Sequence, residues 1–402
     1  MRILFLTNLF PPNVVGGYEV LCCSVAADLA HKGHEVSVLT SSYGAALVQR
    51  TDMTVIRGLR LQVGANIYAP FDGTSAWGKE IERANEAALH RVLSEFAPHI
   101  VFCWNLYGLA SGFFDVIQKT GSQVVVMLTD NWLLGLRSPQ FLSSYFENSV
   151  MSNKETPHEA SLKRIDVNAI FGSNYMRDLY RQGGMEFKSS VVVHNGVRDL
   201  GDAGAASERD FSTQHTKRLL FAGRLVRIKG IETAIEAVAR VNSTAVEGDR
   251  YQLTIVGSVQ DSAYMSHLRS MVEATGRAEL FEFLPTVPES DLVALFKEHD
   301  AYLFPSLYEP FSLTLIHAMQ SGIPVIASDA GGNPEIVEDG VTGILFERGD
   351  AKALSGAILK LFAHEELRRE ISIAGRERAQ NFSFAHMIDG MESYLSQCAG
   401  RG

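Results

Sequence analysis

The segment DAYLFPSLYEPFSLTLIHAMQSGIPVIAS, residues 300–328, contains a complete structural unit of the chain. Its two ends, residues 300–306 and 323–328, are apolar runs with the length of buried strands, and Pro310 and Gly322 interrupt the chain between them. Ser312 can cap a helix that begins at LTLIHAM, where apolar residues recur at helical spacing. A strand, a loop, a helix and a second strand in this order predict one βαβ unit of a parallel sheet.

The same order recurs along the whole chain. Between the apolar runs, residues follow helical spacing, as from Tyr18 to Leu29, and glycines such as Gly33 stand where helices should end. Further strand-like runs occupy residues 2–7, 34–40, 99–104, 122–130, 167–173, 189–196, 218–223, 251–258 and 278–285. Alternating strands and helices in both halves predict an α/β fold with two doubly wound, Rossmann-like domains that face each other across a cleft.

A change of composition marks the boundary between the two domains. Residues 197–217 are rich in Gly, Ala, Ser and Asp and have no sustained apolar period. We therefore expect a first domain at residues 1–200, a linker at 201–216 and a second domain at 217–380. The last segment, residues 381–402, reads as helical, and it either completes the second domain or packs back onto the first.

Composition excludes several classes of protein. The chain has 402 residues, 46% of them hydrophobic, which is enough for two cores, and its net charge of -10 argues against binding to nucleic acid or to anionic lipid. No apolar run approaches the roughly 18 residues of a membrane span, and the first residues lack the cleavage site of a signal peptide. The spacing of the four cysteines fits neither a disulfide framework nor a zinc site, which favours the cytoplasm. These cysteines are Cys22, Cys23, Cys103 and Cys398.

One loop has the features of an anion site. GRLVRIKG, residues 223–230, joins a strand to a helix that begins near Gly230, and Arg224 and Lys229 flank the helix start. Free N–H groups and the positive end of a helix favour phosphate at such a place. The loop matches neither a Walker motif nor a dinucleotide fingerprint, and two solvated surface cations are the ordinary alternative.

Three more helix starts could contact an anion. After Ser312, the N–H groups of Leu313 and Thr314 point out of the start of the next helix and could donate to an anion. The glycine pairs Gly331–Gly332 and Gly16–Gly17 allow a ligand to approach the backbone closely. Each start alone has a structural explanation in turn geometry. Together they suggest a phosphorylated ligand held between the two domains.

The carboxyl half resembles a known family. From about residue 217 to 350, the stretches FAGRLVRIKGIETAIEA, IVGS and FLPTVPESDLVALFKEHDAYLFPSLYEPFSLTLIHAMQSGIPVIASDAGGNPEIVEDGVTGILF are similar to family 4 glycosyltransferases, which have the GT-B fold. VVVHNGV and the Gly16–Gly17 loop extend a thinner similarity into the first half. The resemblance implies transfer of a sugar from a nucleotide sugar with retention of its anomeric configuration.

The resemblance also assigns roles to single residues. Arg224 and Lys229 would bind the donor diphosphate, Gly17 would approach the phosphates from the other domain, and Glu309, the first acid of a Glu-x7-Glu motif, would contact sugar hydroxyls. Without an Asp-x-Asp motif, no metal ion is expected. Backbone groups would hold the sugar and the β-phosphate at Phe311, Ser312, Leu313 and Thr314, and the base at Leu284.

The sequence departs from the family pattern in the donor site. His317 replaces the second Glu of the motif, which would bind ribose hydroxyls, and Ser312 replaces the usual Gly. A neutral imidazole can donate or accept a hydrogen bond, so His317 can serve as a ribose ligand. Altered nucleotide choice and an impaired or non-catalytic protein are the two other readings.

Further departures lie in the first half. In MLTDNW, Thr129 fills the place of a family His that reaches the donor sugar or the acceptor, and Asp130 is kept. Asp130 either assists the acceptor or caps a buried turn. Trp104, Asn105 and Tyr107 either contact a sugar acceptor or belong to the core.

These observations lead to one functional hypothesis with two alternatives. We expect a cytoplasmic, metal-independent, retaining transferase that moves a hexose, glucose first, from a UDP-sugar to a saccharide or glycolipid acceptor in exopolysaccharide or lipopolysaccharide synthesis. The alternatives are a non-catalytic scaffold or sensor that binds nucleotide sugars, and a nucleotide-sugar epimerase. A lipid-linked acceptor would require peripheral contact with the inner face of the membrane, for which residues 132–146 are either a docking patch or core.

Overall fold

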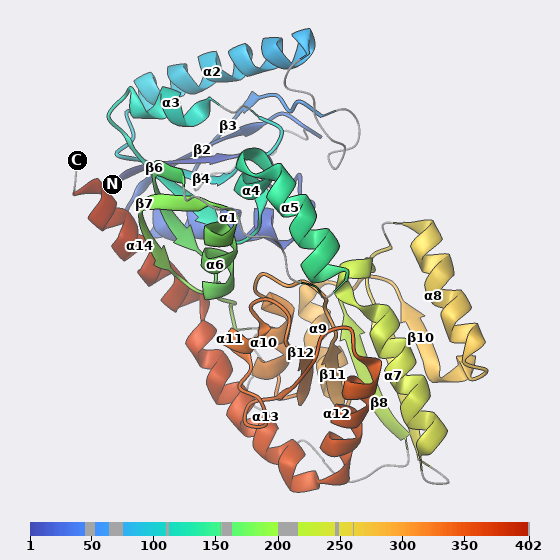
Figure 1. Ribbon diagram of the computed structural model, residues 1–402. Helices are drawn as coiled ribbons and strands as arrows, with labels where there is room; N and C mark the ends of the chain where they lie inside the picture. The colour runs from blue at the N-terminus through green and yellow to red at the C-terminus, as the bar shows by residue number, and fades with distance from the viewer. Residues whose placement is uncertain are drawn as a thin grey trace. The chain divides into compact units, whose positions relative to one another are not determined.

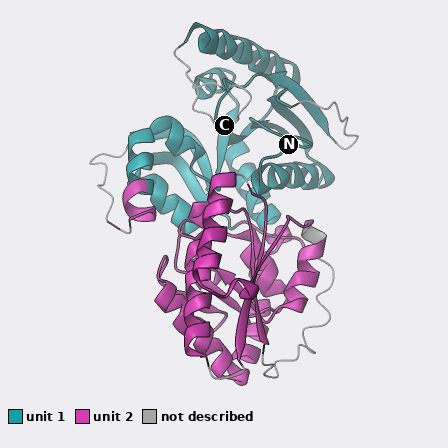
Figure 2. Ribbon diagram, turned by 90° about the vertical axis from the view of Figure 1, so that its right-hand side faces the viewer, with its two compact units in different colours: residues 1–146, 156–194, 387–402 teal, residues 147–155, 195–386 magenta. Residues whose placement is uncertain are grey.

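The described part of the chain forms two compact units, each an α/β structure. Unit 1 comprises residues 1–146, 156–194 and 387–402, and unit 2 comprises residues 147–155 and 195–386 (Figure 2). The predicted fold class, two Rossmann-like domains, is confirmed. The computed structural model describes residues 1–44, 53–63, 75–109, 112–152, 154, 163–199, 216–245, 249–259 and 261–400.

Unit 1 contains a parallel sheet of seven strands in the order β3-β2-β1-β4-β5-β6-β7 (Figure 1). The chain runs outward from β1 to β3 and then returns to the other side of β1 as β4, so the direction of winding reverses between β1 and β4. The strands are β1 (Arg2–Thr7), β2 (Glu35–Ser41), β3 (Thr54–Leu59), β4 (Ile100–Asn105), β5 (Gln123–Leu128), β6 (Lys163–Phe171) and β7 (Met185–Val192). The helices before β7 are α1 (Gly17–His31), α2 (Ala76–Phe96), α3 (Phe113–Gln118), α4 (Trp132–Arg137), α5 (Pro139–Tyr145) and α6 (Asn174–Gln182). The π-helical η1 (Phe146–Val150) belongs to unit 2 from residue 147 onward.

Unit 2 contains a parallel sheet of six strands in the order β10-β9-β8-β11-β12-β13, and its winding reverses between β8 and β11. Ligands of doubly wound sheets bind at the carboxyl ends of the strands on either side of such a reversal. The strands are β8 (Thr216–Ala222), β9 (Arg250–Val256), β10 (Phe281–Leu284), β11 (Ala301–Phe304), β12 (Val325–Ser328) and β13 (Ile344–Phe346). The helices are η3 (Arg227–Lys229), α7 (Ile231–Thr244), α8 (Ser262–Ala274), η4 (Ala278–Leu280), α9 (Glu289–Glu298), α10 (Leu313–Gln320), α11 (Asn333–Ile336), α12 (Ala351–Ala363), α13 (Glu365–Ala379) and η5 (Gln380–Phe382). The last helix, α14 (Phe384–Ala399), begins in unit 2 and belongs to unit 1 from residue 387 onward.

Strand β8 shows why the strand segments are continuous apolar runs. Leu219 and Phe221 lie in a core that includes apolar residues of α7 and α12. Leu220 and Ala222 point to the other face and lie in a second core with residues of α9 and α10. Because helices cover both faces of the sheet, the consecutive side chains from Leu219 to Ala222 are all buried, and polar alternation is lost there.

Two strands were not predicted. In β3, an edge strand, five of six residues are exposed or only partly buried, so the segment lacks an apolar run. The other edge strand, β13, has only three residues, Ile344–Phe346. The expected linker at residues 201–216 falls almost entirely outside the described residues, and its last residue, Thr216, begins β8.

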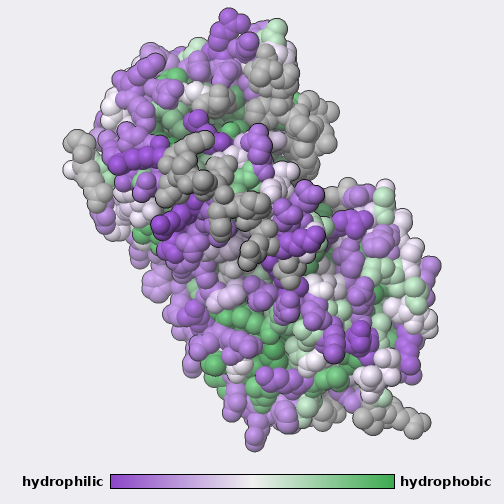
Figure 3. Space-filling view, in the orientation of Figure 1, coloured by the Kyte–Doolittle hydropathy of each residue, from purple (hydrophilic) through white to green (hydrophobic). Residues whose placement is uncertain are grey.

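The segment at residues 132–146 is mainly core, so the docking-patch alternative is wrong for its large apolar side chains. Trp132, Leu133, Phe141 and Tyr145 are all buried. On the face shown in Figure 3, apolar residues are interspersed with hydrophilic ones. Among the described residues, no helix has the length and apolarity needed to cross a bilayer.

The final helix, α14, contributes residues 387–399 to unit 1. In α14, Asp389 and Glu392 accept hydrogen bonds from Lys32 Nζ at 2.9 and 2.8 Å. Glu392 also lies 2.8 Å from His34 Nε2, and Tyr394 Oη lies 2.7 Å from Ser189 Oγ. Exposed ion pairs of this kind stabilise little, so the apolar face of α14 carries most of the attachment.

Three loops of unit 2 pack backbone against backbone at the carboxyl ends of the strands. A Cβ atom at Gly230 would overlap the carbonyl oxygen of Pro305, and one at Gly331 would overlap the carbonyl oxygen of Glu309. Gly230 and Gly331 also have positive φ angles, +64° and +61°. The close approach predicted at Gly331 is therefore an approach to the chain's own backbone, and glycine is required there twice over.

This packing predicts a difference between two glycines with similar φ. Gly340 (φ +73°) has no atom within 4 Å of its would-be Cβ, whereas Gly331 would collide with Glu309. Gly340→Ala should lower the free energy of unfolding by about 1–2 kcal/mol from backbone conformation alone. Gly331→Ala should lower it by about 3 kcal/mol or more. Denaturant unfolding of the two variants measures the difference, and equal losses would contradict the packing described here.

Candidate functional site

Two side chains from distant parts of the sequence meet at the reversal point of unit 2. Lys229 ends the short helix η3 after β8, and Glu309 lies in the loop between β11 and α10. The amide of Leu307 donates to the carbonyl oxygen of Ile228 at 2.8 Å, which joins the two loops. Lys229 Nζ then lies 2.5 Å from Glu309 Oε2. The structure thus brings together two of the three predicted catalytic residues.

The Lys229–Glu309 pair is largely shielded from solvent. The exposed fractions of the two side chains are 16% and 10%. Lys229 Nζ also lies 5.4 Å from the centroid of the Phe304 ring. Burial, followed by the negative charge of Glu309, raises the pKa of the Tyr302 hydroxyl. In such surroundings the two charges interact more strongly than on the surface.

The backbone around Glu309 is fixed by its neighbours. Gly332 donates its N–H to the carbonyl oxygen of Glu309 at 2.8 Å, and Ser328 Oγ donates to the carbonyl oxygen of Ser306 at 2.6 Å. The loops after β11 and β12 therefore support each other. These hydrogen bonds restrain the backbone of Glu309, so its carboxylate moves most readily through the torsions of its own side chain.

Arg224 lies in the same loop as Lys229 but does not join the pair. The loop backbone is anchored to the end of β9, since Gly223 N donates to Val256 O and Leu225 N donates to Ser258 O, both at 2.9 Å. Arg224 itself is exposed. Its guanidinium forms no ion pair with the residues that the structure describes. The side chain is therefore available to a ligand at the carboxyl ends of the strands.

The start of α10 has the predicted cap. Ser312 Oγ accepts a hydrogen bond from Leu315 N at 3.1 Å. The N–H groups of Leu313 and Thr314, in the first turn, have no acceptor within the helix. Phe311 is buried, with its ring centroid 5.5 Å from that of Phe382, so only its backbone could serve a ligand.

His317 lies in the last turn of α10 and is buried. Its Nδ1 is 3.3 Å from Gln320 Oε1. A ring nitrogen of a neutral imidazole can donate or accept, which is what a contact with a ribose hydroxyl would require. Leu284, the residue predicted to contact the base, ends β10, and its carbonyl oxygen accepts from Gly257 N at 3.2 Å.

In unit 1, Asp130 follows β5 and closes the turn that leads into α4. Its Oδ1 accepts a hydrogen bond from Trp132 N, the first residue of α4, at 3.1 Å, which is the turn-capping role considered as an alternative. Burial raises the pKa of the Asp130 carboxyl to about 7; the charge of Glu19 adds to this rise and the Trp132 amide opposes it. Thr129 is buried beside it. Asp130 is therefore both a structural cap and a group that titrates near neutral pH.

The glycine pair of the first loop lies at the start of α1. Glu19 Oε2 accepts hydrogen bonds from Gly16 N at 2.9 Å and from Val15 N at 3.2 Å. A Cβ at Gly16 or at Gly17 would meet no atom within 4 Å. Sequence reasoning missed Glu19, although an acid three residues after a helix cap is a recognisable signal.

The aromatic residues of FCWNLYG divide between core and loop. Trp104 is fully buried, with its ring centroid 5.5 Å from that of Tyr18, so it is core and not a platform for a sugar. Asn105 Oδ1 accepts from Tyr107 N at 2.9 Å and shapes the loop. Tyr18, also missed from the sequence, donates its hydroxyl to the carbonyl oxygens of Met127, at 3.0 Å, and Trp104.

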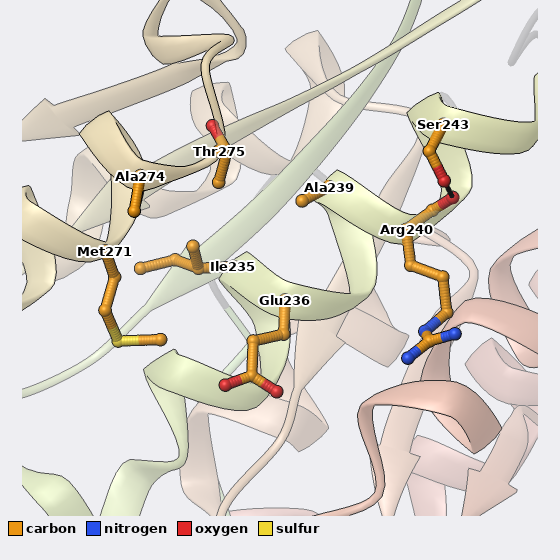
Figure 4. Close-up of a pocket in the computed structure, with 8 residues that line it drawn as sticks. All are labelled: Ile235, Glu236, Ala239, Arg240, Ser243, Met271, Ala274 and Thr275. Atoms are coloured by element: carbon orange, nitrogen blue, oxygen red, sulfur yellow. Dashed lines mark hydrogen bonds between the residues drawn. The ribbon is translucent and has the colours of Figure 1, made fainter.

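The described surface of unit 2 is hollowed in places, and two of these hollows bear on the location of the site. One borders Gly230, Arg227 and Leu307, next to the Lys229 loop. The other, of about 540 Å³, is a groove between α7 and α8 in which Met271 and Ile235 lie near each other (Figure 4). No predicted site residue lines the second groove. Within the described ranges, no three His, Cys, Asp or Glu side chains are grouped to hold a metal ion.

Known proteins match both halves of the chain. Residues 15–199 match the family model described as Glycosyltransferase Family 4, and residues 206–378 match the model described as Glycosyl transferases group 1. A D-inositol 3-phosphate glycosyltransferase of Corynebacterium diphtheriae is 27% identical over 404 residues, covering 96% of this chain and 90% of that protein.

Solved structures share the fold over the full length. Sucrose-phosphate synthase from Thermosynechococcus elongatus has a TM-score of 0.75 at 22% identity, with 100% of both chains covered. Anabaena HepE, solved in complex with UDP-glucose, has a TM-score of 0.68 at 19% identity, with 99% of this chain and 100% of that chain covered. With both halves matched by glycosyltransferase models, the chain belongs to the family 4 glycosyltransferases, with the GT-B fold.

Proposed function

We propose that this glycosyltransferase moves a hexose from a UDP-sugar to an acceptor hydroxyl, with retention and without a metal ion. The observation that carries the proposal is the Lys229–Glu309 pair, with Nζ and Oε2 2.5 Å apart at the reversal point of the second sheet. Arg224 lies in the same loop, and the first N–H groups of α10 follow Glu309. This arrangement offers cations and amides to a diphosphate and a carboxylate to a sugar.

The chemistry requires stabilisation of a leaving diphosphate. The bond between the sugar C1 and the β-phosphate oxygen breaks, and the acceptor oxygen bonds to C1 on the same face. The acceptor proton passes to the departing phosphate oxygen. Lys229, Arg224 and the amides of α10 would stabilise the negative charge that develops, which is the task that a divalent ion performs in other sites.

Donor and acceptor are proposed from different observations. UDP-glucose is our first donor because HepE, which shares the fold, was solved with it. For the acceptor, the resemblance of the sequence favours a saccharide or glycolipid, whereas the relative from Corynebacterium diphtheriae favours an inositol phosphate as a second candidate. The four cysteines are buried, and none of them forms a disulfide within the described residues, which supports the cytoplasm as the compartment.

Removing either cation should impair transfer. Arg224→Met and Lys229→Met should each lower kcat/KM by about 10²- to 10³-fold, the usual cost of one group that stabilises a developing oxyanion. Arg250→Met is the matched control, because Arg250 begins β9 at the opposite edge of the sheet. Nucleotide release from several nucleotide sugars, with saccharide acceptors and D-inositol 3-phosphate, measures the effect. Arg224→Met activity equal to the wild type would contradict the proposal.

Asp130 should make transfer depend on pH if its carboxylate accepts a hydrogen bond from the acceptor. With a pKa near 7, kcat/KM should rise as pH increases through about 7. Asp130→Asn should remove this rise, whereas Asp115→Asn, an exposed control in α3, should keep it. Identical pH profiles for wild type and Asp130→Asn would leave Asp130 with its capping role alone.

The raised pKa of the Asp130 carboxyl should also make the stability of the fold depend on pH. Its pKa in the fold lies above the ordinary 3.8, so the fold disfavours the ionised form. The free energy of unfolding should therefore fall as pH rises from about 4 to about 7, and Asp130→Asn should be free of this contribution. Unfolding of the two proteins at several pH values measures it.

His317 should contribute to donor binding. If the His317 ring meets a ribose hydroxyl, His317→Ala should raise the KM for the donor about tenfold, the effect of one lost hydrogen bond, with little change in kcat. His364→Ala, at an exposed position before α13, is the control. An unchanged KM would contradict the ribose contact. Higher turnover in His317→Glu would instead support the reading of an impaired site.

A further inference from the structure

The chain itself supplies an anion to Lys229. The ammonium lies 2.5 Å from the Glu309 carboxylate, and both side chains are largely buried. A donor phosphate that binds Lys229 must therefore displace the carboxylate or share the ammonium with it. If both anions contact Nζ, they lie only about 5 Å apart and repel each other.

The backbone keeps the carboxylate near Lys229. Gly332 N holds the carbonyl of Glu309 at 2.8 Å, and Gly331 and Gly230 have no room for even one more carbon atom. The loop of Glu309 thus has little freedom to retreat from an incoming phosphate. Relief of the repulsion has to come from the ligand.

A nucleotide sugar and its nucleoside diphosphate product differ in the two properties that matter here. The terminal phosphate of the free diphosphate carries nearly two negative charges near neutral pH, whereas the same phosphate esterified to a sugar carries one. The sugar also brings hydroxyl groups, next to the terminal phosphate, that can donate to a carboxylate, whereas the free diphosphate has no hydroxyl-bearing group beyond that phosphate.

From this we propose that Glu309 discriminates between the two ligands, disfavouring the free nucleoside diphosphate and favouring the nucleotide sugar. The inference rests on the proposed function and deepens it. Glu309 repels the more highly charged terminal phosphate at Lys229 and accepts hydrogen bonds from the sugar. Once the sugar has been transferred, the diphosphate gains charge and loses those hydrogen bonds, so the same carboxylate promotes release of the product.

Binding measurements on Glu309→Gln test the proposal. The amide keeps the size of the side chain but removes the charge. Wild type is first titrated by calorimetry with UDP, ADP and GDP, and the nucleotide that binds is then paired with its glucose ester. In Glu309→Gln, the free diphosphate should bind at least tenfold more tightly, and the glucose ester equally or more weakly. Glu279→Gln is the matched control, because Glu279 lies in η4, at the amino end of β10.

One further variant and two contradicting outcomes make the test decisive. Glu309→Asp keeps the buried charge paired and withdraws the carboxylate by one methylene, so the ratio of the two dissociation constants should change in the same direction by a smaller factor. Unchanged or weaker diphosphate binding in both Glu309 variants would overturn the discrimination and leave the proposed function standing. Wild type that binds none of the nucleotides or esters would overturn both.

Discussion

The packing of bare backbone at the carboxyl edge of the second sheet determines the site. Gly230 lies against Pro305, and Gly331 lies against Glu309, with no space for a side chain at either glycine. These contacts set the separation of the loops after β8, β11 and β12. The 2.5 Å contact between Lys229 and Glu309 is a consequence, because each side chain extends from a loop whose backbone is already held.

Much of this arrangement can be predicted from the sequence, and the reason is physical. Strands covered on both faces must be apolar throughout, so the inner strands are visible as runs such as residues 2–7 and 218–223. The edge strands β3 and β13 cannot be recognised in this way, because β3 is largely exposed or partly buried and β13 has only three residues. Caps such as Ser312 are local and can also be predicted.

Contacts that depend on topology cannot be predicted in the same way. Lys229 and Glu309 are 80 positions apart, and nothing in the spacing of residues states that their side chains meet. The resemblance to a family gave each a role toward a ligand, but not the ion pair between them. Likewise, the MLTDNW stretch left open whether Asp130 caps a turn or serves the acceptor, and the hydrogen bond from Trp132 N establishes only the first role.

The Lys229–Glu309 ion pair could stabilise the fold, bind a ligand, or do both. A buried pair loses much of its attraction to desolvation, and replacing such a pair with well-packed apolar side chains is often neutral or stabilising. A contribution to stability is therefore a weak explanation for the presence of Lys229 and Glu309 at the ends of β8 and β11. A ligand that brings both anionic oxygens and hydroxyl groups gives a stronger one, since it offers each member of the pair a complementary partner. The location of the pair, at the reversal of strand order, favours this second explanation.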